Sequence, residues 1–265
     1  MEHICPAGYF CEEGSIEPRR CKNGTYQDEP GKPVCKLCPG GFICDNRNLP
    51  VTHFNATLCP RGYFCPAGTE IPKPCPQGTY SKHEGLSNFS QCLSCPPGYI
   101  CDDIGQTDYT KPCLKGYFCK KGCPGFAQDN DASEDYGPCP PGHYCPISTN
   151  NPVMCPPGTF SNLTKLENED QCSPCSAGSF CSAAGLLQPD GLCKKGYYCQ
   201  NGSKSSTEKI CPKGYFCDEG SFAAAPCPIG TYNPLEGGES QTYCSDCPGG
   251  SYCEEPGQFK VNCML

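Results

Sequence analysis

Apolar residues stand singly along this chain, between glycine, proline and cysteine, without the three-to-four-residue period of an amphipathic helix. A short segment recurs in which two aromatic residues precede a cysteine, as in residues 8–11 and 214–217. Such aromatic tails favour very short strands. The proline that often follows a cysteine excludes a central strand, and the nearby glycine supplies a turn. The pattern therefore predicts β-ladders of two to four residues, many turns and almost no helix.

The recurring segment belongs to a pattern of six cysteines that occurs four times. It reads C-P-x-G-(Tyr/His)-(Phe/Tyr)-C, then C-x-x-G-T-(Tyr/Phe), a spacer, and C-x-x-C-x-x-G-x-x-C. The four sets are Cys5, Cys11, Cys21, Cys35, Cys38 and Cys44; Cys59, Cys65, Cys75, Cys92, Cys95 and Cys101; Cys139, Cys145, Cys155, Cys172, Cys175 and Cys181; and Cys211, Cys217, Cys227, Cys244, Cys247 and Cys253. Further C-x5-C elements begin at Cys113 and Cys193. This register indicates an array of small modules rather than one large core.

Composition explains why the modules need cross-links. Cysteine makes up 30 of 265 residues, glycine 31 and proline 30, and tryptophan is absent. A module of roughly 40 to 50 residues is too small for burial alone to overcome chain entropy. Closing a loop of about 15 residues by a disulfide stabilises by roughly 3 kcal/mol in the loop-entropy account. We expect a small disulfide-rich fold, with tandem modules of short β-hairpins and loops that form an elongated rod.

The module boundaries follow from the cysteine register. Residues 1–20 form a partial module, 123–154 an insertion with a C-x5-C element, and 211–265 a truncated module. Complete modules are expected at 21–74, 75–122 and 155–210. Cys5 already belongs to the pattern and no apolar leader precedes it, while Cys263 falls where another element would begin. We therefore expect the chain to be a window from a longer array.

Cysteine usage and charge indicate the compartment. Disulfides on this scale persist only in an oxidising environment. Asn-x-Ser/Thr acceptor sites agree with secretion and predict N-linked glycans at Asn23, Asn55, Asn88, Asn162 and Asn201. The net charge of −8 argues against binding nucleic acid or anionic membranes. No run of 18 apolar residues occurs, so we expect no membrane insertion by this segment.

The spacing from Cys75-Pro-Gln-Gly-Thr-Tyr80 to Cys92-Leu-Ser-Cys95-Pro-Pro-Gly-Tyr-Ile-Cys101 resembles the ephrin-receptor-like cysteine-rich repeat. That repeat is a relative of the tumour-necrosis-factor-receptor and EGF-like modules, and the resemblance covers essentially the whole chain. Such repeats occur in large secreted and cell-surface proteins, including flagellar-hair (mastigoneme) proteins. The resemblance implies an architectural role, as a rod or filament component, and implies no catalytic residues.

The resemblance also implies a disulfide pairing, which spacing alone leaves open. Carried over from the receptor-type module, it joins Cys21 to Cys35, Cys75 to Cys92, Cys155 to Cys172 and Cys227 to Cys244. It adds crossed pairs between neighbouring elements: Cys38 with Cys59, Cys44 with Cys65, Cys95 with Cys113, Cys101 with Cys119, Cys175 with Cys193, and Cys181 with Cys199. By the same rule Cys247 would reach Cys263, and Cys5, Cys11 and Cys253 would have partners outside the chain. Cys123, Cys139, Cys145, Cys211 and Cys217 remain unassigned.

Other chemistry fits these residues less well. A zinc site would need two C-x-x-C pairs brought together, and a redox motif would need a βαβ context, so we expect neither metal nor cofactor. Asp129–Asp135 alternates acidic and hydroxyl residues but lacks the glycine and glutamate of an EF-hand, which leaves a solvated loop or weak calcium binding. The paired aromatics, such as Tyr9 and Phe10, are expected to cover a disulfide and the next module, with sugar stacking as the alternative.

Repetition without a unique site favours a non-enzymatic structural protein. We expect a glycosylated repeat subunit of an extracellular filament, hair, coat or matrix, on the cell surface or on a flagellar or ciliary surface. Its partners would be copies of itself or other extracellular structural proteins. The alternative is the ectodomain of a receptor or adhesion protein that binds a protein ligand, with residues 123–138 as a contact loop. An enzyme or an inhibitor with a loop at 201–210 is a third, weaker hypothesis.

Overall fold

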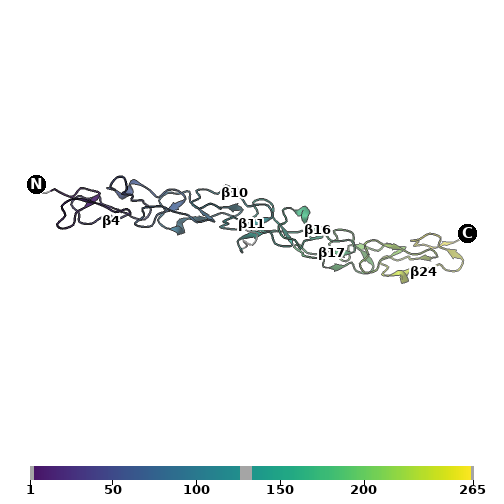
Figure 1. The fold of residues 1–265 in the computed structure, drawn as a ribbon. Coiled ribbons are helices and arrows are strands. Elements are labelled where there is room, and N and C mark those ends of the chain that lie inside the picture. The colour runs from purple at the N-terminus through teal and green to yellow at the C-terminus, as the bar shows by residue number, and fades with distance from the viewer. Residues whose placement is uncertain (1–2, 126–132, 264–265) are drawn as a thin grey trace. The chain divides into compact units, whose positions relative to one another are not determined.

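The computed structural model describes residues 3–125 and 133–263. Within this part of the chain the regular structure consists of two-stranded antiparallel hairpins and single turns of 3-10 helix (Figure 1). In the first half of the chain the paired strands are β1 (Tyr9–Phe10) with β2 (Arg19–Arg20), β3 (Thr25–Tyr26) with β4 (Lys36–Leu37), β5 (Tyr63–Phe64) with β6 (Lys73–Pro74), β7 (Thr79–Tyr80) with β8 (Leu93–Ser94), β9 (Tyr99–Ile100) with β10 (Lys111–Pro112), and β11 (Tyr117–Cys119) with β12 (Tyr136–Pro138).

The second half repeats the arrangement. Its pairs are β13 (His143–Tyr144) with β14 (Val153–Met154), β15 (Thr159–Phe160) with β16 (Ser173–Pro174), β17 (Ser179–Phe180) with β18 (Gly191–Leu192), β19 (Tyr197–Tyr198) with β20 (Lys209–Ile210), β21 (Tyr215–Phe216) with β22 (Ala225–Pro226), β23 (Thr231–Tyr232) with β24 (Ser245–Asp246), and β25 (Ser251–Tyr252) with β26 (Asn262–Cys263). The 3-10 turns are η1 (Phe54–Ala56), η2 (Phe89–Gln91), η3 (Glu169–Gln171) and η4 (Gln241–Tyr243). The expected disulfide-rich array of short hairpins is therefore confirmed.

The chain divides into two compact units. The first unit comprises residues 1–114, 118–137 and 148–150, and the second comprises 115–117, 138–147 and 151–265. An element is here the seven-residue segment that begins with Cys and has Gly at its fourth position. The module boundaries expected from the sequence stay a prediction.

Backbone hydrogen bonds join each element to the next within a unit. The glycine of one element donates its amide to the carbonyl of the seventh residue of the next, as from Gly41 to Cys65 at 2.8 Å. The carbonyl of that glycine accepts from the amide of the next element's first cysteine, as from Cys59 to Gly41 at 2.9 Å. The glycines that make both bonds are Gly8, Gly24, Gly41, Gly62, Gly78 and Gly98 in the first unit, and Gly116, Gly142, Gly158, Gly178, Gly196, Gly214 and Gly230 in the second. We call this pair of bonds the junction.

Glycine is required at the junction for two reasons. Gly41 has φ +90°, a conformation that side chains strongly disfavour. A Cβ on Gly41 would also lie 2.6 Å from the carbonyl oxygen of Gly85, which belongs to the loop two elements further on. Gly41 therefore combines an unusual backbone angle with a close approach between backbones.

The aromatic residue before the second cysteine covers the disulfide of the following element. Phe64 packs against the cluster of Cys75, Leu86 and Cys92. Tyr144 packs in the same way against the corresponding cluster of Cys155, Leu166 and Cys172. The preceding ring contacts a later loop instead: a Cβ on Gly105 would meet the Tyr63 ring at 3.3 Å. The prediction that one ring covers a disulfide while the other packs further along the array is therefore confirmed for Tyr63 and Phe64.

Among the described residues there are fourteen disulfide bonds, and they are of two kinds. The long-loop bonds are Cys21–Cys35, Cys75–Cys92, Cys155–Cys172 and Cys227–Cys244, as the resemblance implied. The short-loop bonds close single elements: Cys5–Cys11, Cys38–Cys44, Cys59–Cys65, Cys95–Cys101, Cys113–Cys119, Cys139–Cys145, Cys175–Cys181, Cys193–Cys199, Cys211–Cys217 and Cys247–Cys253.

The crossed pairs are wrong. The structure does not join Cys38 to Cys59, Cys44 to Cys65, Cys95 to Cys113, Cys101 to Cys119, Cys175 to Cys193, Cys181 to Cys199 or Cys247 to Cys263, and Cys5, Cys11 and Cys253 have partners within the chain. The turn at the glycine folds each element back on itself. The two Cα atoms of Cys59 and Cys65 then lie 5.8 Å apart, a usual distance for a disulfide.

Candidate functional site

The five predicted glycan acceptors occupy different surroundings. Asn55, Asn88, Asn162 and Asn201 are exposed, and Asn23 is half-buried. Exposure makes a glycan sterically possible, and no contact in the structure tests whether one is attached. Glycosylation at these asparagines therefore stays a prediction.

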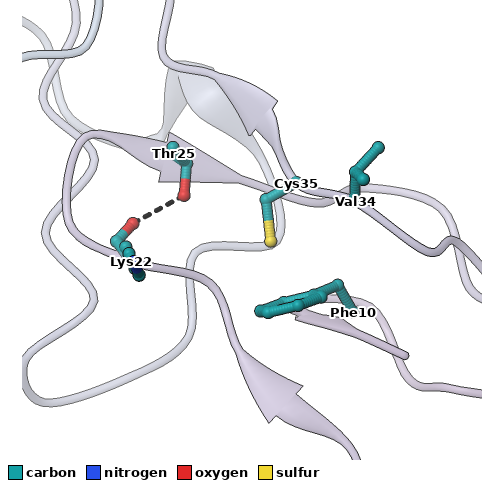
Figure 2. Close-up of a pocket in the computed structure, with 5 residues that line it drawn as sticks. All are labelled: Phe10, Lys22, Thr25, Val34 and Cys35. Atoms are coloured by element: carbon teal, nitrogen blue, oxygen red, sulfur yellow. Dashed lines mark hydrogen bonds between the residues drawn. The ribbon is translucent and has the colours of Figure 1, made fainter. Parts of the chain in front are cut away.

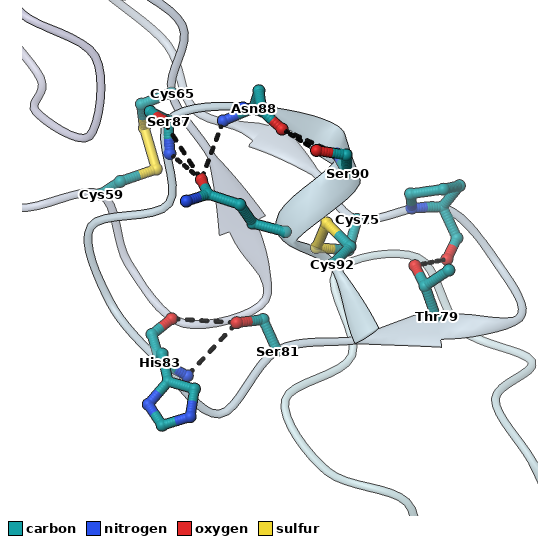
Figure 3. The surroundings of a disulfide bond; sticks show 12 residues. Cys59, Cys65, Cys75, Thr79, Ser81, His83, Ser87, Asn88, Ser90 and Cys92 are labelled. Carbon is teal, nitrogen blue, oxygen red and sulfur yellow. Dashed lines mark hydrogen bonds between the residues drawn. A yellow bond between two sulfur atoms is a disulfide. The ribbon is translucent and has the colours of Figure 1, made fainter. Parts of the chain in front are cut away.

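Asn88 begins the 3-10 turn η2, and its side chain is fixed there by local contacts. Its Oδ1 accepts from the backbone amide of Ser90 at 3.0 Å and from the Ser90 hydroxyl at 2.5 Å (Figure 3). The Gln91 side chain accepts from the Asn88 amide in return, which completes a capping box. The sequon at Asn88 is thus held on an ordered and exposed turn.

Asn23 and Asn201 make bonds between neighbouring elements. The Oδ1 of Asn23 accepts from the Asn46 amide at 2.8 Å, and the Oδ1 of Asn201 accepts from the Ala177 amide at 2.9 Å. Both asparagines therefore have a structural role that the sequon pattern alone does not indicate.

The surface pockets of the first unit include one at the first element, lined by residues within 3–18, and two further along the chain. The smaller of these two, about 180 Å³, lies beside the Cys21–Cys35 disulfide and is lined by Phe10, Lys22, Thr25, Val34 and Cys35. Figure 2 shows the Phe10 ring facing the sulfur of Cys35, and the Thr25 hydroxyl donating to the Lys22 carbonyl at 2.6 Å. Its walls are almost wholly apolar, so it can offer burial but little polar recognition.

The larger pocket, about 610 Å³, lies along the linker between Cys44 and Cys59. We call it the linker pocket. It is lined by Ile43, Asp45, Arg47, Asn48, Leu49, Pro50, Val51, Thr52, His53, Thr57, Glu70 and Pro72. Sequence reasoning missed these residues. The available signal was the absence of the glycine that stands three residues after the second cysteine in several other elements, where this element has Arg47.

Where that glycine is missing, the buried side chain of Asn46 connects the linker to the preceding element. The Nδ2 of Asn46 donates to the carbonyls of Lys22 and Thr25, at 2.9 and 2.7 Å, and its Oδ1 accepts from the Val51 amide at 2.7 Å. Arg20 adds a bond from Nη1 to the Asn46 carbonyl at 3.2 Å. The linker is therefore anchored by side chains as well as by the backbone bond from the Gln27 amide to the Val51 carbonyl.

Opposite charges pair at several places on the surface of the first unit, and two of these pairings lower a carboxyl pKa strongly. The ammonium groups of Lys32 and Lys36 hydrogen-bond to Glu29 and hold the pKa of its carboxyl at about 2. Hydrogen bonds from Arg47 likewise lower the pKa of Asp45 to about 2. Both carboxylates are already neutralised by their partners, so neither is poised as a general acid or base.

Cys123 is the one unpaired cysteine side chain among the residues for which side chains are described. It is buried, and burial raises the pKa of its thiol. Its carbonyl accepts from the Cys101 amide at 2.9 Å. A protonated, inaccessible thiol is a poor nucleophile, so the geometry gives Cys123 a packing role.

The sequence also raised metal binding, a calcium or contact loop, and membrane insertion. Over the described ranges, no three His, Cys, Asp or Glu side chains gather as a metal site would require. Most of the acidic stretch at 129–135, and residues 126–132 of the proposed contact loop at 123–138, lie outside the described residues. Within residues 3–125 and 133–263, none of the helices has the length and apolar character needed to cross a bilayer.

Comparison with known proteins finds relatives among modular proteins. Over 180 residues, 66% of the chain, it is 28% identical to "Sushi, von Willebrand factor type A, EGF and pentraxin domain-containing protein 1" of Mus musculus, of which it covers 5%. Over 244 residues, 72% of the chain, it is 28% identical to "Cysteine repeat modular protein A" of Toxoplasma gondii, of which it covers 7%. It is 28% identical over 167 residues, 51% of the chain, to "Signal peptide, CUB and EGF-like domain-containing protein 3" of Homo sapiens, of which it covers 16%.

The chain matches no known protein-family profile. It spans a small part of the length of each relative, and the relatives' names describe domains and name no catalysed reaction. These relatives support the resemblance to EGF-like and other cysteine-repeat modules. They do not show that the modules are of the ephrin-receptor type. With its disulfides, the similarity makes this chain an extracellular cysteine-rich repeat protein.

Proposed function

We propose that this chain is a non-enzymatic structural segment of an extracellular assembly such as a filament, hair, coat or matrix. The observation that carries the proposal is the junction, which repeats at successive elements in each compact unit. Each element is stabilised by its neighbours, as in other repeat proteins, so length can grow by adding elements. Regular repetition suits mechanical and spacing roles better than the single converging site of an enzyme.

Surface composition supports assembly through protein contacts. Large apolar side chains stay exposed along both units, among them Ile16, Leu49, Phe89, Phe222 and Ile229. The acidic net charge opposes binding to nucleic acid and to anionic lipid. We infer that its partners are further copies of this chain or other extracellular structural proteins, and that N-linked glycans cover part of the surface.

Electron microscopy of the native, unreduced material tests the proposal. We expect periodic fibres, and fibres that disperse when the disulfides are reduced. Purified protein that stays a monodisperse monomer at high concentration, under conditions that keep the disulfides intact, would contradict the structural role.

A second candidate is the ectodomain of a receptor or adhesion protein. It is favoured by the linker pocket, because that pocket interrupts the regular array and joins charged to apolar walls. This candidate predicts a membrane-spanning segment elsewhere in the full-length protein and rods anchored singly in a membrane. A full-length sequence without a membrane anchor would exclude it.

A further inference from the structure

The linker pocket lies directly beside a glycan acceptor site. His53 and Thr57 both line the pocket, and Asn55 stands between them in η1. Thr57 is also the hydroxyl residue of the Asn55 sequon. Asn55 itself is exposed. A glycan on Asn55 would therefore start at the edge of a pocket large enough to receive sugar rings.

The position of the acceptor is fixed by the residue before it. The Phe54 ring lies 5.4 Å from the Tyr26 ring and 5.2 Å from the Phe42 ring, measured between ring centroids. The contact with Phe42 is edge-to-face and that with Tyr26 is tilted, and such ring contacts hold an aromatic side chain in place. Because Phe54 is anchored in the core of the two preceding elements, Asn55 is held next to the pocket.

The pocket walls match the chemistry of a carbohydrate. Leu49, Pro50 and Pro72 provide apolar surface, and Leu49 leaves 76% of its surface exposed. Arg47 and Glu70 add hydrogen-bonding groups among these apolar walls. Sugar rings have one apolar face and a rim of hydroxyls, and sites for small polar molecules combine apolar walls with a few placed polar groups.

The pocket is also preformed. Asn46 holds the linker through bonds to Val51 and to the preceding element, and Arg20 bonds to the linker carbonyls of Asn46 and Arg47. A preformed pocket need not be ordered when its occupant enters, which lowers the cost of binding. A covalently attached occupant also has a high effective concentration.

We propose that the N-linked glycan on Asn55 folds back into the linker pocket. Its first sugars then cover Leu49 and the prolines and fill the interruption of the array at the linker, whose walls are both charged and apolar. The glycan thereby acts as a structural part of the linker, unlike the glycans on exposed turns such as Asn88.

The test uses the whole chain secreted from a glycosylating eukaryotic host. An amidase that removes N-glycans is applied to the native protein and, separately, to reduced and denatured protein, and release at each site is followed by peptide mass spectrometry. We expect release at Asn55 to be slowed in the native state, relative to denatured protein, by about tenfold more than release at Asn88.

Two variants sharpen the result. Leu49→Glu places a charge on the apolar wall at an exposed position, so the fold is kept, and it should bring the native release rate at Asn55 up to that at Asn88. Asn55→Gln should increase protease cleavage after Arg47, whereas the matched Asn88→Gln should not. Equal native protection at Asn55 and Asn88 would overturn the proposal. Absence of a glycan from Asn55, in protein that carries one on Asn88, would overturn it as well.

Discussion

The elements that begin at Cys59 and Cys75 are neighbours in chain and space, yet they are closed differently (Figure 3). The first is closed by Cys59–Cys65, a bond across six positions. The second uses Cys75–Cys92, across 17 positions, and has Ser81 where the first has its second cysteine. Despite this difference, Cys65 and Ser81 accept the same junction bond, from Gly41 and Gly62.

The comparison shows which feature sets the geometry of the array. Ser81 is 1% exposed, and Gln27, Ser161 and Asn233 are buried at the same position of the other long-loop elements. Their side chains vary while the backbone bonds stay. The junction glycine and its turn therefore define the repeat. Each disulfide stabilises the loop that it closes, whether that loop is short or long.

The largest effect is expected from removing a long-loop disulfide. Changing both Cys75 and Cys92 to Ser should destabilise the surrounding elements by about 3 kcal/mol, and the same change at Cys59 and Cys65 by about 2 kcal/mol, because loop-closure entropy grows with loop length. Native-state hydrogen exchange at the flanking junction amides measures both. If the short-loop variant exchanged faster than the long-loop variant, loop entropy would not explain the difference.

A second prediction separates backbone strain from the close approach at the junction. Gly14→Ala, at φ +81° with no atom within 4 Å of the new Cβ, should cost about 1 kcal/mol. Gly41→Ala, with the Gly85 carbonyl in the way, should cost about 2 to 3 kcal/mol. Protease resistance and thermal unfolding compare the two. Equal costs would mean that the junction tolerates a side chain.

A third change converts one kind of element into the other. Ser81→Cys combined with Cys92→Ser should let Cys75 form a disulfide with the cysteine introduced six positions later, and should keep the junction bonds. Shortening the loop should lower stability by about 1 kcal/mol, the difference between the two loop sizes. Mass spectrometry of unreduced peptides identifies the new bond. Recovery of both cysteines as free thiols would show that the long-loop element has a different geometry.

The smallest expected effect is electrostatic. Since the pKa of Glu29 is lowered from an ordinary 4.5 to about 2, its ion pairs stabilise the fold above about pH 4.5, and that contribution is lost as the pH falls toward 2. The group is solvent-exposed, so the effect should be small and should weaken with salt. Glu29→Gln should remove it. A Glu29 carboxyl that titrates normally by NMR would contradict the ion pairs.

Much of the fold was predictable because it depends on local spacing. The aromatic tails at residues 9–10 and 63–64 predicted two-residue strands, and the resemblance implied Cys75–Cys92 correctly. The crossed pairs were wrong because the turn at the glycine brings the two cysteines of one element together. The pairing carried over from the receptor-type module takes no account of that turn. The missing glycine at Arg47 marks the linker in the sequence, but the shape of the linker pocket could not be predicted, since it depends on how Asn46 reaches the preceding element.

Disulfide mapping of native protein tests most directly whether each short-loop element closes on itself. Trypsin can cut after Lys36 and Arg47, which isolates residues 37–47 with Cys38 and Cys44. We predict that this peptide is released alone from unreduced protein, with its internal Cys38–Cys44 bond. If it stayed attached to the peptides that contain Cys59 and Cys65, the elements would be joined by crossed disulfides and the central claim would fail.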